Sequence, residues 1–279
     1  MAVNLQRAVI AEPLELRHAA ITNRFRLESC LFKAPADCSY ASFEQGFEFS
    51  DSQFAADADF TGVTTRRAAV LLGTAFSGKA SFRDATAKEV FLASGAAFLG
   101  PEAGFDRATF LKFANFSPSA GQPAASFSGE VAFTEARFAG PVSLERVRWG
   151  NPKGTVDFTE LRCDRAASFR GSEFRGRTSF ASAVFLGNVT FGVPEGDPEV
   201  PPAARFLSET SFDSVQFQGE ANFNQVQFAH ASQVSFDGGA FGDDARFAKV
   251  RFAGGVLFSQ VGFKAMTDFP VPGPPRIMT

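Results

Sequence analysis

Residues 41–60 read ASFEQGFEFSDSQFAADADF, and within them Phe43, Phe49, Phe54 and Phe60 recur at alternating intervals of six and five residues. The same alternation extends outward in both directions, and fifteen of the first sixteen positions that it marks are apolar. These positions are Leu5, Ile10, Leu16, Ile21, Leu27, Phe32, Cys38, Phe43, Phe49, Phe54, Phe60, Thr65, Leu71, Phe76, Phe82 and Ala87. In a chain that is 45% hydrophobic, this regularity indicates a true repeat with a period of eleven residues.

A second apolar series lies two residues before the first. Thirteen of its sixteen members are small or β-branched: Val3, Ala8, Ala19, Cys30, Ala36, Ala41, Ser52, Ala58, Val63, Ala69, Thr74, Ala80 and Ala85. Residues two apart on an extended segment share a face. Each repeat unit is therefore predicted to be a very short strand with one small and one large side chain pointing inward.

The spacing excludes helices, because a helix needs a period of 3.6 residues sustained over ten or more residues. The chain must instead turn a corner after each short strand. Three large residues interrupt the small series at related intervals, since Phe25 and Phe47 are 22 residues apart and Phe91 lies 44 residues further on. We therefore predict an all-β solenoid with about 22 residues per coil and four strands per coil.

Units such as Ala221-Asn222-Phe223-Asn224-Gln225 resemble those of the pentapeptide-repeat proteins in their Phe-centred variety, from about Val3 to Phe269. The resemblance implies a right-handed quadrilateral β-helix, here of about eleven coils, and suggests a bacterial source. The extra residue in alternate units departs from the family's strict pattern of fives. We expect one solenoid domain over residues 1–269, followed by a Pro-rich tail over residues 270–279.

Four insertions interrupt the repeat, near residues 117–126, 150–155, 192–205 and 229–234. With the face that holds Leu5 counted as face one, we expect most breaks to adjoin face three. Rigid solenoids often vary their insertions on a binding face, although neutral drift explains loops equally well. The longest insertion gives a candidate binding loop, with Val193, Pro194, Glu195, Asp197 and Glu199 as its candidate residues.

The charge balance bears on which macromolecules the chain could bind. Some pentapeptide-repeat proteins imitate the shape and charge of duplex DNA and bind type II topoisomerases such as gyrase. This chain has 30 acidic and 27 basic residues, so its near-neutral net charge disfavours such mimicry. A local acidic stretch, comprising Glu44, Glu48, Asp51, Asp57 and Asp59, is more simply interpreted as a solvated surface.

A candidate basic collar arises where five arginines fall within one coil: Arg162, Arg165, Arg170, Arg175 and Arg177. Acidic residues, namely Glu160, Asp164 and Glu173, are interleaved with them. Because nucleic-acid binding needs clustered and uncompensated positive charge, direct binding of nucleic acid is disfavoured.

Few residues suggest chemistry. Cys30, Cys38 and Cys163 occupy inward positions without CxxC spacing, so we expect buried thiols rather than a disulfide framework or a zinc site. His18 and His230 lie near corners and far apart in sequence. We find no catalytic or nucleotide-binding motif, and expect no enzyme activity, no cofactor and no metal. A cytoplasmic location is expected, since no signal peptide or membrane span is evident.

Two functions stay open on this basis. The favoured hypothesis is a non-enzymatic scaffold that binds another protein through its faces and loops, and the alternative is a DNA mimic that protects or inhibits gyrase. An open β-helix end also exposes unpaired backbone groups. We therefore expect a second protomer or a partner to cover the N-terminal coil, and the prolines after Phe269 to stop the stack.

Overall fold

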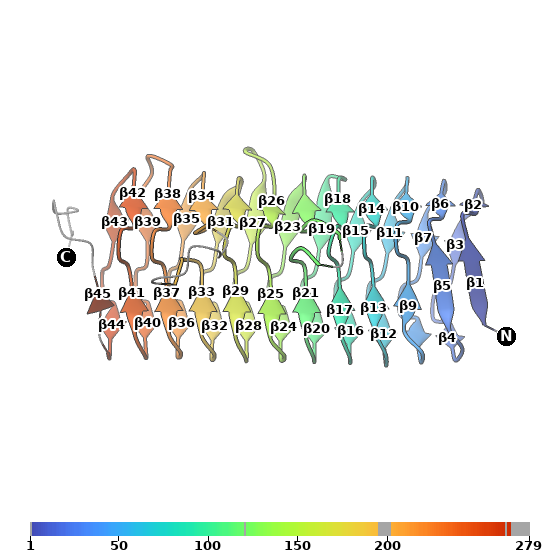
Figure 1. Cartoon of the computed structure of the whole chain (residues 1–279), viewed down its shortest axis with the longest axis horizontal. Helices are drawn as coiled ribbons and strands as arrows, with labels where there is room; N and C mark the ends of the chain where they lie inside the picture. Colours follow the sequence, from blue (N-terminus) through green and yellow to red (C-terminus); the bar gives the residue numbers. More distant parts are fainter. Residues whose placement is uncertain (1, 120, 195–201, 266, 269–279) are drawn as a thin grey trace.

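The computed structural model describes residues 2–119, 121–194, 202–265 and 267–268. Within these residues the chain forms 45 short strands and no helix, and the strands wind into a rod (Figure 1). Each strand pairs in parallel with the strand four places along the chain, so that four sheets form the four faces of the rod. The described part contains no helix long and apolar enough to cross a membrane.

Face one has twelve strands: β1 (Val3–Gln6), β5 (Phe25–Glu28), β9 (Phe47–Glu48), β13 (Ala69–Val70), β17 (Phe91–Leu92), β21 (Ala114–Asn115), β25 (Val142–Ser143), β29 (Ala167–Ser168), β33 (Val189–Thr190), β37 (Ala221–Asn222), β41 (Ala245–Arg246) and β45 (Thr267–Asp268). Face two has eleven: β2 (Val9–Ile10), β6 (Leu31–Phe32), β10 (Gln53–Phe54), β14 (Ala75–Phe76), β18 (Ala97–Phe98), β22 (Ser126–Phe127), β26 (Arg148–Trp149), β30 (Glu173–Phe174), β34 (Arg205–Phe206), β38 (Gln227–Phe228) and β42 (Arg251–Phe252).

Face three has eleven: β3 (Leu14–Glu15), β7 (Ala36–Asp37), β11 (Ala58–Asp59), β15 (Ala80–Ser81), β19 (Glu102–Gly104), β23 (Glu130–Ala132), β27 (Thr155–Asp157), β31 (Arg177–Ser179), β35 (Thr210–Ser211), β39 (Val234–Ser235) and β43 (Val256–Leu257). Face four also has eleven: β4 (Ala20–Ile21), β8 (Ser42–Phe43), β12 (Thr64–Thr65), β16 (Thr86–Ala87), β20 (Thr109–Phe110), β24 (Arg137–Phe138), β28 (Arg162–Cys163), β32 (Val184–Phe185), β36 (Gln216–Phe217), β40 (Ala240–Phe241) and β44 (Gly262–Phe263).

The predicted four-sided β-solenoid is confirmed. Partner residues in neighbouring coils are 22 apart where no insertion intervenes, as in the pairing of Phe54 with Phe76. The strands make eleven complete coils, and β45 begins a twelfth. We number the coils from their face-one strands, so coil four begins at β13.

Two kinds of corner explain the alternation of five and six residues. Corners from face three to face four are tight four-residue turns. The second of the two central residues has a positive φ, for example Tyr40 at 57°. The amide of Ala41 donates to the carbonyl of Cys38 at 3.0 Å and closes that turn. A positive φ at this place is what a type II turn requires. Corners from face four to face one carry one more residue and, apart from Gly46, lack the positive φ.

Stacked phenylalanines fill the rod. Along face two the rings of Phe54, Phe76 and Phe98 lie nearly parallel, with centroids 5.0 Å apart at each step. Rings on adjacent faces meet edge to face, as Phe54 and Phe60 do at 84°. Both arrangements are favourable for aromatic pairs and add to the burial of apolar surface.

Coil one is the open N-terminal end of the described stack. Leu5 is 46% exposed, whereas Leu27, which occupies the same place in coil two, is 2% exposed. Coverage of this coil by a second protomer or a partner stays a prediction.

All four insertions adjoin face two, and the prediction that most of them adjoin face three is correct for two of the four. Residues 117–125 and 192–204 connect face one to face two, whereas residues 150–154 and 229–233 connect face two to face three. The eleven-residue step from Phe116 to Phe127 has the length of two repeat units but makes a single corner. If this stretch is counted as two units, every later inward residue is assigned to the face that follows its true face.

One buried side chain on face four lacks a partner and gives a stability prediction. Thr65 is 2% exposed, and its Oγ1 has no hydrogen-bond partner among the described residues. Because an unsatisfied buried hydroxyl is costly, we expect Thr65→Val to raise the free energy of unfolding by about 1 kcal/mol in urea denaturation. Thr74→Val is the matched control, since Thr74 Oγ1 donates to the carbonyl of Phe49 at 2.8 Å. This control should lower stability, and equal effects of the two changes would contradict the assignment.

Candidate protein-binding face

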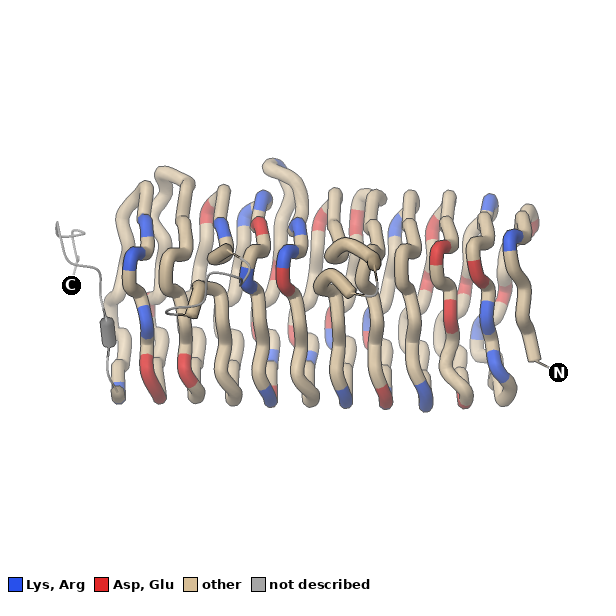
Figure 2. Tube along the Cα trace, viewed as in Figure 1, with Lys and Arg blue, Asp and Glu red and all other residues tan. Residues whose placement is uncertain are grey.

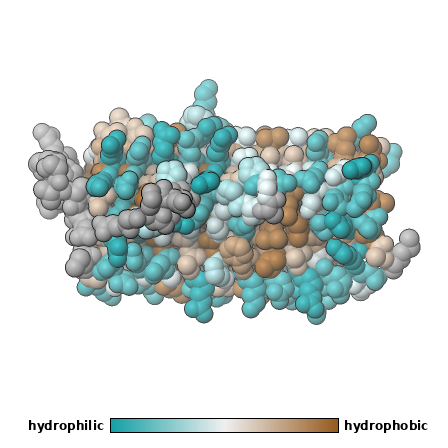
Figure 3. All heavy atoms as spheres, in the orientation of Figure 1, coloured by the Kyte–Doolittle hydropathy of each residue, from teal (hydrophilic) through white to brown (hydrophobic). Residues whose placement is uncertain are grey.

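An apolar patch lies on face one of coils four to six, where outward positions on other coils are mostly polar. We define the apolar patch as Val70, Leu72, Val90, Leu92 and Phe113. Val70 and Leu92 are register partners in neighbouring strands, and Phe113 precedes the next strand, β21. Phe113 is 40% exposed, and the other four residues are half-buried. Figure 3 shows an apolar area near the middle of this face.

The insertion at residues 117–125 borders the patch along the corner between faces one and two. Asn115 Nδ2 donates to Ser94 Oγ at 3.1 Å, and the Ser94 and Ser119 hydroxyls lie 2.7 Å apart. Further along the loop, Gln122 Nε2 donates to Asp51 Oδ1 in coil three at 3.1 Å. The loop is thus held against several earlier coils and forms a wall beside the patch.

A row of positive charge borders the patch on its other side, at the corner between faces four and one. We define the basic row as Arg67, Lys88 and Lys112, which occupy successive coils and are exposed. None of the three makes an ion pair with another described residue. Lys88 is level with Arg66 of the preceding coil, whereas the half-buried Glu89 is level with Arg67 and Lys112 and lies between them. With three cations and this one carboxylate, the row keeps a net positive charge.

Many other charges form local pairs, and the surface carries both signs along the rod (Figure 2). Arg83, for example, contacts Asp106 at 2.9 Å and Glu102 at 3.1 Å. On the same corner, Arg107 Nε lies 2.7 Å from Asp84 Oδ1, and this hydrogen bond holds the pKa of Asp84 below its usual value. Paired charges of this kind leave little uncompensated field for steering a partner.

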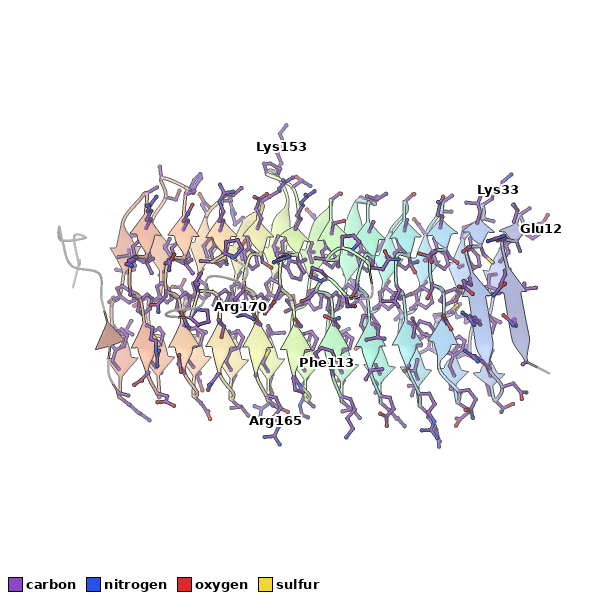
Figure 4. The ribbon with its side chains drawn as sticks, viewed as in Figure 1. Glu12, Lys33, Phe113, Lys153, Arg165 and Arg170 are labelled. Carbon is purple, nitrogen blue, oxygen red and sulfur yellow. The ribbon has the colours of Figure 1, made fainter. Side chains whose placement is uncertain are left out.

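The five arginines of the candidate collar do not form one surface, because they are spread around the rod. Four of them pair with carboxylates at 2.6 to 3.0 Å: Arg162 with Asp164, Arg170 with Glu145, Arg175 with Glu173, and Arg177 with Glu209. Arg165, which projects from the rod in Figure 4, is exposed at the corner between faces four and one. The structure therefore brings no basic cluster together at this coil.

The acidic stretch is dispersed in the same way. Glu44 pairs with Arg66 at 2.9 Å, and Glu48 pairs with Arg26 at 3.2 Å. Asp57 lies at a different corner and accepts a hydrogen bond from the Lys79 amide at 2.8 Å. These carboxylates occupy different sides of the rod and make no continuous negative stripe.

The candidate loop is described only in part. The Val193 amide donates to the carbonyl of Asn224 at 3.0 Å, and Pro194 borders a groove with Thr190 and Asn222 on face one. The remaining candidates, Glu195, Asp197 and Glu199, lie outside the described residues, as does the tail.

The cysteines are buried and free, as predicted. Burial raises the pKa of Cys38 to about 12, and burial also raises the pKa of Cys163. His18 stacks on Tyr40 with ring centroids 5.2 Å apart, and His230 Nδ1 accepts a hydrogen bond from the Ser232 amide. Among the described residues, no group of three His, Cys, Asp or Glu side chains is placed to hold a metal ion.

The geometry defines a repeat protein that folds as a four-sided parallel β-solenoid. No family model matches the chain, and no curated protein or solved structure matches it.

The apolar patch was not predicted from the sequence, although its signal is present there. The residue between the two inward positions of a face-one strand is Asn115 in coil six and Ser143 in coil seven, but Val70 and Leu92 in coils four and five. Comparing only these middle positions between coils would have identified the patch.

Proposed function

We propose that this chain is a non-enzymatic scaffold of the pentapeptide-repeat type, which binds a protein partner through the apolar patch on face one. The observation that carries the proposal is the patch itself. Contiguous exposed apolar residues on a soluble surface commonly mark interaction sites. A rigid solenoid face also loses little conformational entropy when a partner binds.

The neighbouring features support this assignment. The wall formed by residues 117–125 and the basic row give the patch two different borders, and so give a bound partner a defined orientation. The mixture of both charge signs along the rod (Figure 2) favours this function over imitation of DNA, for which a continuous negative face is needed. The buried free thiols are consistent with work in the cytoplasm, which we include in the proposal.

Site-specific photocrosslinking tests the proposal. A photoreactive amino acid at position 92 should yield a discrete crosslinked protein in extract of the source cell, because that position lies within the patch. The same amino acid at position 132, which is Ala132 on face three, is the control and should yield none. Identical products from both positions, or no product from position 92, would contradict the proposal.

A further inference from the structure

We infer that the partner segment is an acidic amphipathic helix that lies along the axis of the rod, with its apolar side on the patch and its carboxylates facing the basic row. This inference rests on the proposed function and adds the shape and charge of the partner. It follows from the dimensions of face one and from the charges that border it.

The spacing of the coils favours a helix. Stacked strands lie about 4.8 Å apart, so successive patch residues along the rod, such as Val70 and Leu92, repeat at that distance. A helix offers apolar residues at i, i+3 and i+7, which are about 4.5 and 6 Å apart along its axis. An extended segment places same-side residues about 6.6 Å apart and therefore loses register within the three coils of the patch.

The width of the face favours the same arrangement. In coil four, face one is five residues wide, from Ala68 to Leu72, and β13 forms two of these five. From Ala68 to Leu72 the backbone extends for about 13 Å. A helix about 10–12 Å in diameter fits this width when it lies along the rod, between the wall and the basic row.

The basic row gives the charge of the partner. Arg67, Lys88 and Lys112 are exposed and make no ion pair with another described residue, whereas Arg66 beside them is satisfied by Glu44 at 2.9 Å. Carboxylates on the side of the helix that faces the basic row would pair with these cations, whereas a lysine on that side would be repelled. On the opposite flank, the wall offers the neutral Ser119 and Gln122 side chains, and the Asp51 carboxylate that Gln122 contacts adds no positive charge there.

The test measures the affinity of two synthetic helical peptides for the full chain by fluorescence anisotropy. Both peptides carry leucine along one side, and the flanks carry glutamate in one peptide and lysine in its twin. We expect the glutamate peptide to bind at least about tenfold more tightly, and this preference to shrink in high salt. In Arg67→Glu/Lys88→Glu/Lys112→Glu the order of the two affinities should reverse.

A control variant separates local charge from total charge. Lys33→Glu/Lys153→Glu/Arg251→Glu changes the net charge by the same amount, at exposed positions away from the corner between faces four and one; Lys33 and Lys153 are labelled in Figure 4. It should leave the preference for the glutamate peptide unchanged. If this control also reverses the order, the basic row does not select the partner.

Further outcomes distinguish the inference from the proposed function. If Leu92→Asn/Phe113→Asn abolishes binding but both peptides bind the natural chain equally, the patch binds protein and the acidic helix is wrong. If that variant binds both peptides as the natural chain does, the patch itself is not the site. Binding to phosphatidylserine vesicles that depends on the same three cations would instead indicate a membrane surface and overturn the inference.

Discussion

Replacing Phe223 by Asp is expected to lower the free energy of unfolding by at least about 4 kcal/mol, and to unfold the coils around face one of coil ten. Phe223 is fully buried, and its ring lies 5.0 Å from the rings of Phe191 and Phe247 in the neighbouring coils. A carboxylate there loses both stacking contacts and has no cation within the apolar core. Urea denaturation followed by circular dichroism measures the loss.

Because coils contact only their neighbours, the damage should start locally. Limited proteolysis of Phe223→Asp should therefore cut near coil ten at urea concentrations that leave the first coils intact. The control is Gln225→Asp, at an exposed position in the same coil, which should melt as the natural chain does. A melting curve of Phe223→Asp that overlays that of Gln225→Asp would contradict the assigned register.

Replacing Gly100 by Val is expected to cost about 3 kcal/mol or more, although the residue is small and lies at a corner. A Cβ at this position would lie 1.9 Å from the carbonyl oxygen of Gly78 in the preceding coil. The obstacle is backbone, so it cannot move aside without separating two stacked coils. Thermal denaturation of the variant measures the cost.

Gly262→Val is the matched control, because no described atom lies within 4 Å of a Cβ at that position and a β-branched residue suits a strand. It should leave the melting temperature unchanged or slightly higher. If Gly100→Val and Gly262→Val melt alike, the coils are not packed as closely at this corner as the structure indicates.

The repeat itself could be predicted because every equivalent inward position requires the same kind of side chain, and this requirement produces a regular pattern in the sequence. A buried ring such as Phe76 must follow a small residue by two positions, and the requirement recurs at every strand. The corners are harder to recognise in the sequence, because Tyr40, Asp84 and Arg107 adopt a positive φ although they are not glycine. Those residues are set in that conformation by the stacked strands on either side.

The path of the insertions could not be read from the repeat. The stretch from Phe116 to Phe127 has a length that fits two strands, and only the pairing of Ala97 with Ser126 shows that it makes one corner. The candidate site depends on the same information, because the position of residues 117–125 beside the patch follows from the contact of Gln122 with Asp51. That contact spans three coils and has no signature in the local sequence.

Quantitative capture of partners from extract of the source cell tests most directly whether the apolar patch binds a protein. The bait chains are the natural protein, Leu92→Asn/Phe113→Asn, and Leu99→Asn. Asparagine suits both patch positions, since Asn115 and Asn188 occupy the equivalent places in other coils. Leu99 is an exposed leucine at the corner between faces two and three, away from the patch.

We expect the natural protein and Leu99→Asn to capture the same partner, and Leu92→Asn/Phe113→Asn to capture at least about tenfold less of it, because apolar anchors of the interface are removed. Equal capture by all three chains would show that the partner binds elsewhere on the rod and would contradict the assignment of the apolar patch as the binding site.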